Sequence, residues 1–381
     1  MTTAGKKKRP SVGMYATVGS RCGIADYTQA LLRALEPHAA VRTVPLRPAS
    51  LNPFRTLVAG LRLSRRDIAH VQHTYSFFGV DPLTYTVLIR LLFSSIRAPL
   101  VLTAHTVREP SPTRYAGGLG SRLANQVDAP AWIDRETFCR PQAVIVHAAC
   151  HRDRLAARGV PAERIHVIPP GIPPRTPVSP SEVKAFRDRF ALRPEHPVIG
   201  VFGFLDSSKR VEILLEAVAG LDGRPTLLLA GGPRLPSHEA SRHTLRQHAA
   251  QYGMAERLVV TGYLEAATVP VALEAMDIVV VPYATDHSMS YSLHLALGQL
   301  RPVATTDLAP LREVQERGEC LQLVPAEDAR AWRETLMQLL ADGTLRARLA
   351  GATLAYAAAE GLATAAQRTL SVYQAAREAM P

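Results

Sequence analysis

Short apolar segments alternate with amphipathic segments along most of the chain. In the first half the apolar segments suit buried strands, and stretches between them, such as 24–35, place apolar side chains at helical spacing. Strands that alternate with helices predict parallel sheets joined by right-handed crossovers. We expect strands in this half at 11–17, 41–46, 68–72, 99–104, 143–147 and 164–169.

A proline-rich segment at 168–180 interrupts the alternation. Five of the residues 169–177 are proline, which fixes φ and removes a backbone donor, so the segment is typical of a linker between domains. A helix is expected to start after it, at Ser181 and Glu182. The alternation then resumes, with strands expected at 198–203, 226–231, 257–262, 277–282 and 302–306, and with helix through nearly all of 326–379.

The pattern therefore predicts an α/β protein of two Rossmann-like, doubly wound domains that face each other across a cleft. We place the N-terminal domain at 1–175 and the C-terminal domain at 176–360. The last segment, 361–381, is rich in alanine, so we expect a helix that packs closely, back toward the N-terminal domain.

The composition of the 381 residues excludes several classes of protein. Hydrophobic residues make up 47% and charged residues 20%, which is ordinary for a globular chain and excludes a disordered tail, a collagen and a coiled coil. No apolar run reaches the roughly 18 residues of a membrane-spanning helix, and no small-residue cleavage site follows the basic start of the chain. The four cysteines show no CxxC spacing, as in a reducing compartment. We expect a cytoplasmic protein.

Charge is distributed unevenly between the two halves. Residues 1–175 carry 24 basic and 10 acidic residues, a net +14, whereas residues 176–381 carry 20 and 23, a net −3. Such a basic half indicates an anionic partner, either an acidic acceptor or an anionic membrane surface at which the protein would be peripheral. Arginines lie among apolar residues in the stretch 51–66, which is where we expect a membrane contact. A solubilising surface is the alternative. Nucleic acid is not expected, because the basic residues are dispersed and form no known binding motif.

Ligands of parallel α/β sheets bind beyond the carboxyl ends of the strands, so the loops there hold the candidate residues. In the first half, Gly19 and Gly23 belong to a loop that allows the backbone to approach a sugar or a phosphate; a tight turn is the alternative. His105 follows the strand at 99–104, where an imidazole hydrogen-bonds a hydroxyl or carries a proton unless it is simply packed.

In the second half, Lys209 and Arg210 open a helix after the strand at 198–203. Basic residues oppose the dipole at a helix N-terminus, and a bound diphosphate would reverse that cost. A later loop combines hydroxyls with the free amides of a helix start, which form either an anion site or a serine cap. The glycines at other strand ends allow close backbone approach. The candidate anion-binding residues are Gly203, Lys209, Arg210, Gly231, Gly262, Tyr263, His287, Ser288, Met289, Ser290 and Tyr291.

Metal ligation is not expected. His147, Cys150 and His151 lie close in sequence, but no second cluster of ligands accompanies them.

These segments, in this order, resemble the retaining GT-B glycosyltransferases of family 4 over nearly the whole chain. The resemblance rests on GIADYTQALLRAL (23–35), HVQHTYSFFG (70–79), VLTAHT (101–106), HVIPPGIP (166–173), GFLDSSKRVEILLEAV (203–218), LLLAGGP (227–233), TGYL (261–264) and ALGQLRPVATTDLAPLREV (296–314).

The resemblance implies a nucleoside-diphosphate sugar donor, transfer to an acceptor hydroxyl with retention of configuration, and no metal. It places the donor mainly on the C-terminal candidates named above and Gly19, and it makes His105 and Lys209 the catalytic candidates. The acceptor, a small molecule or a lipid-linked sugar, is expected against the N-terminal domain. Its candidate contacts are Arg21, Gly23, Gln72 and His73.

The chain departs from the family pattern at three positions. His287 and Leu295 stand where the family carries a pair of glutamates, and Phe204 stands where an arginine is usual. The loss of both acids leaves two alternatives open. The chain could be a noncatalytic GT-B subunit of a glycosylation complex, or a nucleotide-sugar epimerase or synthase on the same fold.

Overall fold

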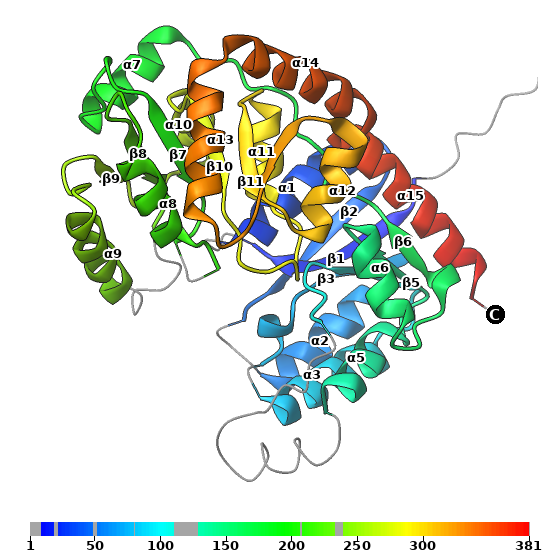
Figure 1. The fold of residues 1–381 in the computed structure, drawn as a ribbon. Helices are drawn as coiled ribbons and strands as arrows, with labels where there is room; N and C mark the ends of the chain where they lie inside the picture. The colour runs from blue at the N-terminus through cyan, green and yellow to red at the C-terminus, as the bar shows by residue number, and fades with distance from the viewer. Residues whose placement is uncertain are drawn as a thin grey trace, which may run out of the picture. The chain divides into compact units, whose positions relative to one another are not determined.

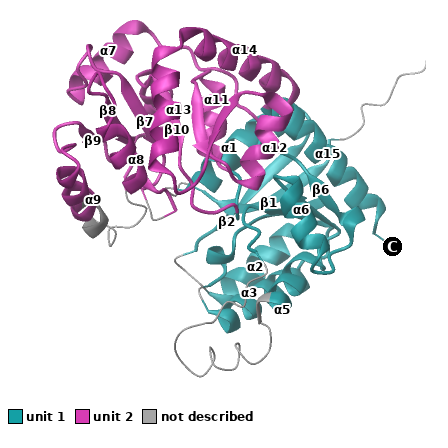
Figure 2. Ribbon diagram, in the orientation of Figure 1, with its two compact units in different colours: residues 1–170, 287–289, 362–381 teal, residues 171–286, 290–361 magenta. Residues whose placement is uncertain are grey.

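The computed structural model describes residues 9–18, 22–48, 52–79, 81–109, 129–205, 208–232 and 239–380. The chain forms two compact units, which are coloured separately in Figure 2. The N-terminal unit comprises residues 1–170, 287–289 and 362–381, and the C-terminal unit comprises residues 171–286 and 290–361. Each unit is built on one parallel sheet of six strands, so the predicted pair of α/β domains is confirmed.

The N-terminal unit has the strand order β2-β1-β3-β4-β5-β6 (Figure 1). Its strands are β1 (Ser11–Thr17), β2 (Ala40–Leu46), β3 (Ile68–His73), β4 (Leu100–Ala104), β5 (Ala143–Val146) and β6 (Ile165–Val167). Its helices are α1 (Gly23–Leu35), α2 (Pro53–Leu63), α3 (Pro82–Ser95), α5 (Ala129–Phe138), α6 (Ala149–Ala156) and α15 (Leu362–Glu378).

The two faces of this sheet are covered by different helices. Side chains alternate between the faces of a strand, and one set, including Ala69, Val71 and Leu102, joins the buried core with α2, α3 and α5. The other set faces α1 and α15, which pack against each other. Because all of β3 is buried, its polar residues His70, Gln72 and His73 must find partners inside the unit.

The C-terminal unit has the order β12-β11-β10-β7-β8-β9, which is the dinucleotide-fold order read from its other edge. Its strands are β7 (Val198–Phe202), β8 (Thr226–Ala230), β9 (Leu258–Val260), β10 (Ile278–Val281), β11 (Val303–Thr306) and β12 (Leu321–Val324). Its helices are α7 (Pro180–Arg189), α8 (Val211–Ala219), α9 (Glu239–Gln251), α10 (Val269–Glu274), α11 (Tyr291–Gly298), α12 (Ala309–Gly318), α13 (Ala329–Ala341) and α14 (Gly343–Ala359).

Two features of the C-terminal half differ from the sequence prediction. The strand β12 was not predicted, and the helix expected through 326–379 is divided into α13, α14 and α15. Asp342 makes the first division because its side chain caps α14 by accepting from the Leu345 amide at 2.9 Å. At the linker, α7 begins at Pro180, one residue before the expected start, because Ser179 and Glu182 form a capping box.

No helix among the described residues is long and apolar enough to cross a membrane.

Candidate functional site

Three glycines end neighbouring strands of the C-terminal sheet. Gly203, Gly231 and Gly262 follow β7, β8 and β9 and have φ angles of +115°, +158° and +73°. A Cβ atom on Gly231 would lie 1.9 Å from the carbonyl oxygen of Gly203. The turns therefore require glycine, and without a Cβ atom they allow a ligand to approach the backbone closely at this edge. The amides of Gly203 and Gly231 themselves donate to the carbonyl oxygens of Ala230 and Leu229.

Lys209 lies at the same edge, where the strand order reverses between β7 and β10. Only 6% of the residue is exposed, and Nζ donates to the carbonyl oxygens of Phe202 at 3.2 Å and Phe204 at 3.0 Å. An ammonium group has three donors, so among the described residues these two bonds leave one N–H for a ligand. A bridge to Tyr283, in the loop after β10, fixes the backbone of Lys209. A buried lysine held at a sheet's switch point is suited to an anion.

Arg210 is placed differently from Lys209. It is the N-cap residue of α8, and its side chain forms an ion pair with Glu327, at the surface. An anionic ligand would have to displace the Glu327 carboxylate in order to pair with Arg210.

The predicted serine loop divides between two roles. Ser290 is the N-cap of α11, because its Oγ accepts from the Leu293 amide at 3.1 Å. The residues His287–Met289 belong instead to the N-terminal unit, where the Val107 amide donates to the His287 carbonyl oxygen at 2.8 Å. The serine cap that the sequence left open as an alternative is thus present at Ser290. Tyr291 opens α11, Ser288 is exposed, and the side chain of Tyr263 is 40% exposed.

His287 and Leu295, which stand where the family has two glutamates, have different surroundings. His287 offers its carbonyl oxygen to Val107, and Leu295 is half-buried within α11. Neither supplies a carboxylate. Phe204, where an arginine is usual, offers its carbonyl oxygen to Lys209.

In the N-terminal unit, His105 follows β4 and is held at both ring nitrogens. Nε2 lies 2.7 Å from Gln72 Oε1, and Nδ1 lies 3.3 Å from His147 Nε2. The Tyr27 ring of α1 meets the imidazole edge-on, with centroids 5.1 Å apart. Burial lowers the pKa of His105 well below 6.5, and the neighbouring histidines 147, 73 and 70 lower it further. His105 is therefore neutral at pH 7.

The predicted acceptor residues lie in different surroundings. Gln72 and His73 are fully buried, with Gln72 bonded to His105 and with His73 Nε2 2.7 Å from the Tyr85 hydroxyl. Gly23 starts α1 and has open space where a side chain would be. Gly19 and Arg21 lie outside the described residues. A direct contact of Gln72 or His73 with an acceptor stays a prediction, and it requires these buried side chains to become accessible.

The sequence prediction gave no role to two further residues, His147 and Tyr373. His147 contacts His105 from the end of β5, and the Tyr373 hydroxyl of α15 lies 2.7 Å from His70 Nδ1. The available signal was the strand 68–73, which is buried yet carries three polar side chains. Such a strand requires polar partners, but it does not say from which part of the chain they come.

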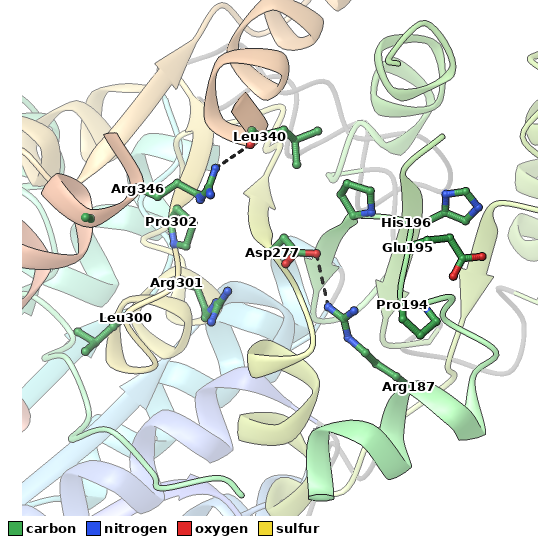
Figure 3. Close-up of a pocket in the computed structure, with 12 residues that line it drawn as sticks. Arg187, Pro194, Glu195, His196, Asp277, Leu300, Arg301, Pro302, Leu340 and Arg346 are labelled. Carbon is green, nitrogen blue, oxygen red and sulfur yellow. Dashed lines mark hydrogen bonds and ion pairs between the residues drawn. The ribbon is translucent and has the colours of Figure 1, made fainter. Parts of the chain in front are cut away.

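A cavity of about 460 Å³ opens at the opposite, amino-terminal edge of the C-terminal sheet. Figure 3 shows Arg187 reaching from α7 toward Asp277, whose Oδ2 accepts its hydrogen bond at 3.4 Å. Arg346, also in its wall, donates to the carbonyl oxygens of Leu339 and Leu340. None of the predicted site residues lines this cavity, so it is separate from the candidate site at the carboxyl edge.

Within the described ranges, no three histidine, cysteine, aspartate or glutamate side chains are grouped in a way that would hold a metal ion.

The fold is shared with solved structures. The chain matches HepE of Anabaena in complex with UDP-glucose with a TM-score of 0.72 at 18% identity, over 95% of this chain and 100% of that one. It matches the sucrose-phosphate synthase of Thermosynechococcus elongatus with a TM-score of 0.72 at 18% identity, over 96% and 98%. Two parallel α/β domains with these neighbours define the GT-B fold.

The sequence comparisons give the family. The model described as Glycosyltransferase Family 4 matches residues 24–176, and the model described as Glycosyl transferases group 1 matches residues 196–342. A D-inositol 3-phosphate glycosyltransferase of Xylanimonas cellulosilytica is 31% identical over 292 residues, which are 74% of this chain and 68% of that protein. The alpha-D-kanosaminyltransferase of Streptomyces kanamyceticus is 24% identical over 74% of this chain and 72% of its own. The chain belongs to glycosyltransferase family 4, and the resemblance seen in its motifs is confirmed.

Proposed function

We propose that this glycosyltransferase moves a sugar from a nucleoside-diphosphate sugar to an acceptor hydroxyl with retention of configuration. The observation that carries the proposal is the buried ammonium group of Lys209 among three glycine turns at one sheet edge. The donor class is supported by the related fold of HepE, which has been crystallised with UDP and with UDP-glucose.

In the proposed reaction, the bond between the anomeric carbon and the diphosphate oxygen breaks while the acceptor oxygen bonds to the same carbon. The leaving oxygen takes the acceptor's proton on the same face of the sugar. Charge develops on the diphosphate, where the third N–H of Lys209 would stabilise it without a resident metal. Neutral His105 would position the sugar or the acceptor.

A thermal-shift screen tests the donor assignment. UDP, GDP, ADP, CDP and TDP are added separately to the wild type, to Lys209→Ala and to Lys184→Ala. Lys184 is the matched control because it is exposed on α7 and pairs with Asp188 at 2.6 Å. A ligand present at 100 times its Kd should stabilise the wild type and the control by about 2.7 kcal/mol, and should not stabilise Lys209→Ala.

The unliganded melting temperature of each variant first establishes that it folds, and Lys209→Gln serves if the alanine variant does not. With the donor selected by the screen, kcat/KM of the Lys209 variant should fall tenfold or more, about 1.4 kcal/mol. Equal shifts for both lysine variants would remove Lys209 from the diphosphate. No shift with any nucleotide would favour a noncatalytic subunit, and product formation from the donor without an acceptor would favour an epimerase.

The acceptor is proposed to be a small molecule with an anionic group. The net +14 of residues 1–175 and the relative named as a D-inositol 3-phosphate glycosyltransferase support this class. Transfer to inositol 3-phosphate should exceed transfer to unphosphorylated inositol at equal concentration. The reverse preference would contradict an anionic acceptor.

A lipid-linked acceptor is the second proposal, and the surface of α2 and α3 supports it. Phe54 and Leu61 of α2 are 71% and 50% exposed, and Leu83 of α3 is 68% exposed, with the exposed Arg55 and Arg62 nearby. Apolar side chains with arginines suit an anionic membrane surface. Vesicle sedimentation should rise with the phosphatidylserine fraction for the wild type and for Leu354→Ser, a similarly exposed leucine on α14, and should be lost in Phe54→Ser/Leu61→Ser. Sedimentation that is independent of phosphatidylserine would contradict this contact.

A further inference from the structure

A line of polar side chains crosses three strands of the N-terminal sheet on the face covered by α1 and α15. His147 Nδ1 lies 2.8 Å from the Ile168 carbonyl oxygen, and His147 Nε2 lies 3.3 Å from His105 Nδ1. On the other side of His105, Nε2 lies 2.7 Å from the amide of Gln72. That amide also lies 3.3 Å from His70 Nε2. Four side chains in a row are thus hydrogen-bonded end to end.

The proton positions in this line are not independent. A carbonyl oxygen only accepts, so His147 must carry a proton on Nδ1. A neutral imidazole carries one proton, so His147 Nε2 is then an acceptor. His105 must therefore donate from Nδ1 to His147, or else two lone pairs face each other across 3.3 Å.

The proton on His105 Nδ1 decides what Gln72 presents. A neutral His105 with Nδ1–H has a bare Nε2, which requires a donor, and the NH₂ of Gln72 is the donor within reach. The oxygen and nitrogen of a glutamine amide are assigned from the hydrogen bonds around them, so the amide turns over to satisfy this arrangement. Its oxygen then lies 3.3 Å from His70 Nε2, whose proton is shared with Thr103 Oγ1 at 2.7 Å, while His70 Nδ1 accepts from the Tyr373 hydroxyl at 2.7 Å. The hydrogen bonds among these side chains are then formed without a net charge, and the amide gives up only its bond to Met14 Sδ at 3.2 Å.

The alternative arrangement keeps the amide oxygen toward His105 Nε2. It requires a proton on both nitrogens of His105, and hence a positive charge on the His105–His147 pair. Burial opposes that charge: the pKa of His105 lies well below 6.5 because of desolvation, followed by the neighbouring His147. The facing groups from the other packed elements are the Tyr27 ring of α1, the Tyr373 hydroxyl of α15, and His70 and His73 of β3.

We propose that His147 is a positioning residue for His105: it holds the proton of the neutral imidazole on Nδ1 and leaves Nε2 as a hydrogen-bond acceptor. This inference rests on the proposed function, because it concerns how His105 meets a substrate. A substrate hydroxyl that replaces the Gln72 NH₂ at Nε2 donates its hydrogen bond to His105. Without His147, the proton moves to Nε2 and the ring loses that acceptor.

The proton position is measured directly by ¹⁵N NMR of the histidine rings in the unliganded protein, with signals assigned by single histidine substitutions. Wild-type His105 should show a protonated Nδ1 and a bare Nε2 at pH 7. His147→Asn keeps a group that can bond to Ile168 but removes the partner of His105, so the proton should shift to Nε2. His147→Gln keeps an amide that reaches toward His105 and should retain Nδ1–H. His166→Asn, on β6 and outside the line, is the control and should change nothing.

Turnover of the donor selected by the nucleotide screen gives a second measurement. His147→Asn should lower kcat about tenfold or more with little change in the donor KM, and His147→Gln should recover much of the loss, because a displaced positioning group misaligns the bound substrate. The proposal is overturned if wild-type His105 carries its proton on Nε2, or if His147→Asn leaves its tautomer unchanged. Absence of transfer by the wild type would instead overturn the proposed function, and the ring signals would still decide the role of His147.

Discussion

The two sheets end their strands at chemically different edges. The N-terminal edge is fixed by side chains: the half-buried His105 bonds to Gln72 and His147, and the buried His70 bonds to Gln72 and Tyr373. The C-terminal edge is fixed by backbone: glycines at positive φ turn the chain, and Lys209 bonds to carbonyl oxygens. One edge therefore depends on protonation, and the other depends on the absence of Cβ atoms. The two should fail under different perturbations.

Acid should destabilise the N-terminal unit more than the C-terminal unit, and this is the largest difference that we expect. Burial lowers the pKa of His70 to about 3, and burial together with the nearby Arg108 lowers the pKa of His73 to about 3, compared with 6.5 for an exposed histidine. The unfolded chain therefore binds more protons below pH 6.5, so the stability is fully present above that pH and is lost as the pH falls toward 3. Each of these two histidines should lower the free energy of unfolding by about 2 kcal/mol between pH 7 and pH 5, which is about 4 kcal/mol for both.

The C-terminal unit offers the comparison for this measurement. It buries His294, whose pKa is lowered to about 4 by desolvation. His294 should lower the free energy of unfolding by about 2 kcal/mol over the same pH interval. Hydrogen exchange of peptides from β3 and from β10, corrected for the intrinsic rates at each pH, should show the larger loss of protection in β3. Equal losses in both strands would contradict the assignment of the acid-sensitive groups to the N-terminal unit.

Gly231→Ala should perturb the other edge. Its Cβ would lie 1.9 Å from the Gly203 carbonyl oxygen, which belongs to backbone and cannot turn aside as a side chain would. We expect a loss of about 3 kcal/mol in urea unfolding, together with weaker nucleotide binding. Gly351→Ala is the control: this glycine lies within α14, a Cβ there meets nothing within 4 Å, and helix propensity predicts a small gain in stability. A Gly231 variant as stable as the wild type would mean that the turn relaxes.

The difference between the edges also explains what the sequence alone could predict. Apolar periodicity located most strands, and glycines after strands located the turns at Gly203, Gly231 and Gly262, because both are local signals. The strand β12 was not predicted because Leu321–Val324 is short and only half buried. It also closely follows Glu319, whose φ is +49°. The hydrogen-bond partners of His70 and His105 were not predicted because they are distant in sequence: Tyr373 is 303 positions from His70, and His147 is 42 positions from His105. The substrate roles of the candidate residues stay predictions, since each depends on a ligand.

Tyr373→Phe should have the smallest of the three effects, and it tests whether the polar edge depends on each hydrogen bond. The substitution removes one oxygen from a side chain that is 1% exposed and leaves His70 Nδ1 buried without its partner at 2.7 Å. An unsatisfied buried group costs about 1–3 kcal/mol, so we expect a loss of about 1 to 2 kcal/mol by urea unfolding. Tyr252→Phe removes the same atom from an exposed side chain of the C-terminal unit, whose hydroxyl donates to Glu216 at 3.4 Å, and should change the stability by less than about 0.5 kcal/mol. Equal effects of the two substitutions would mean that His70 turns to another partner, and that the N-terminal edge is less tightly specified than its hydrogen bonds indicate.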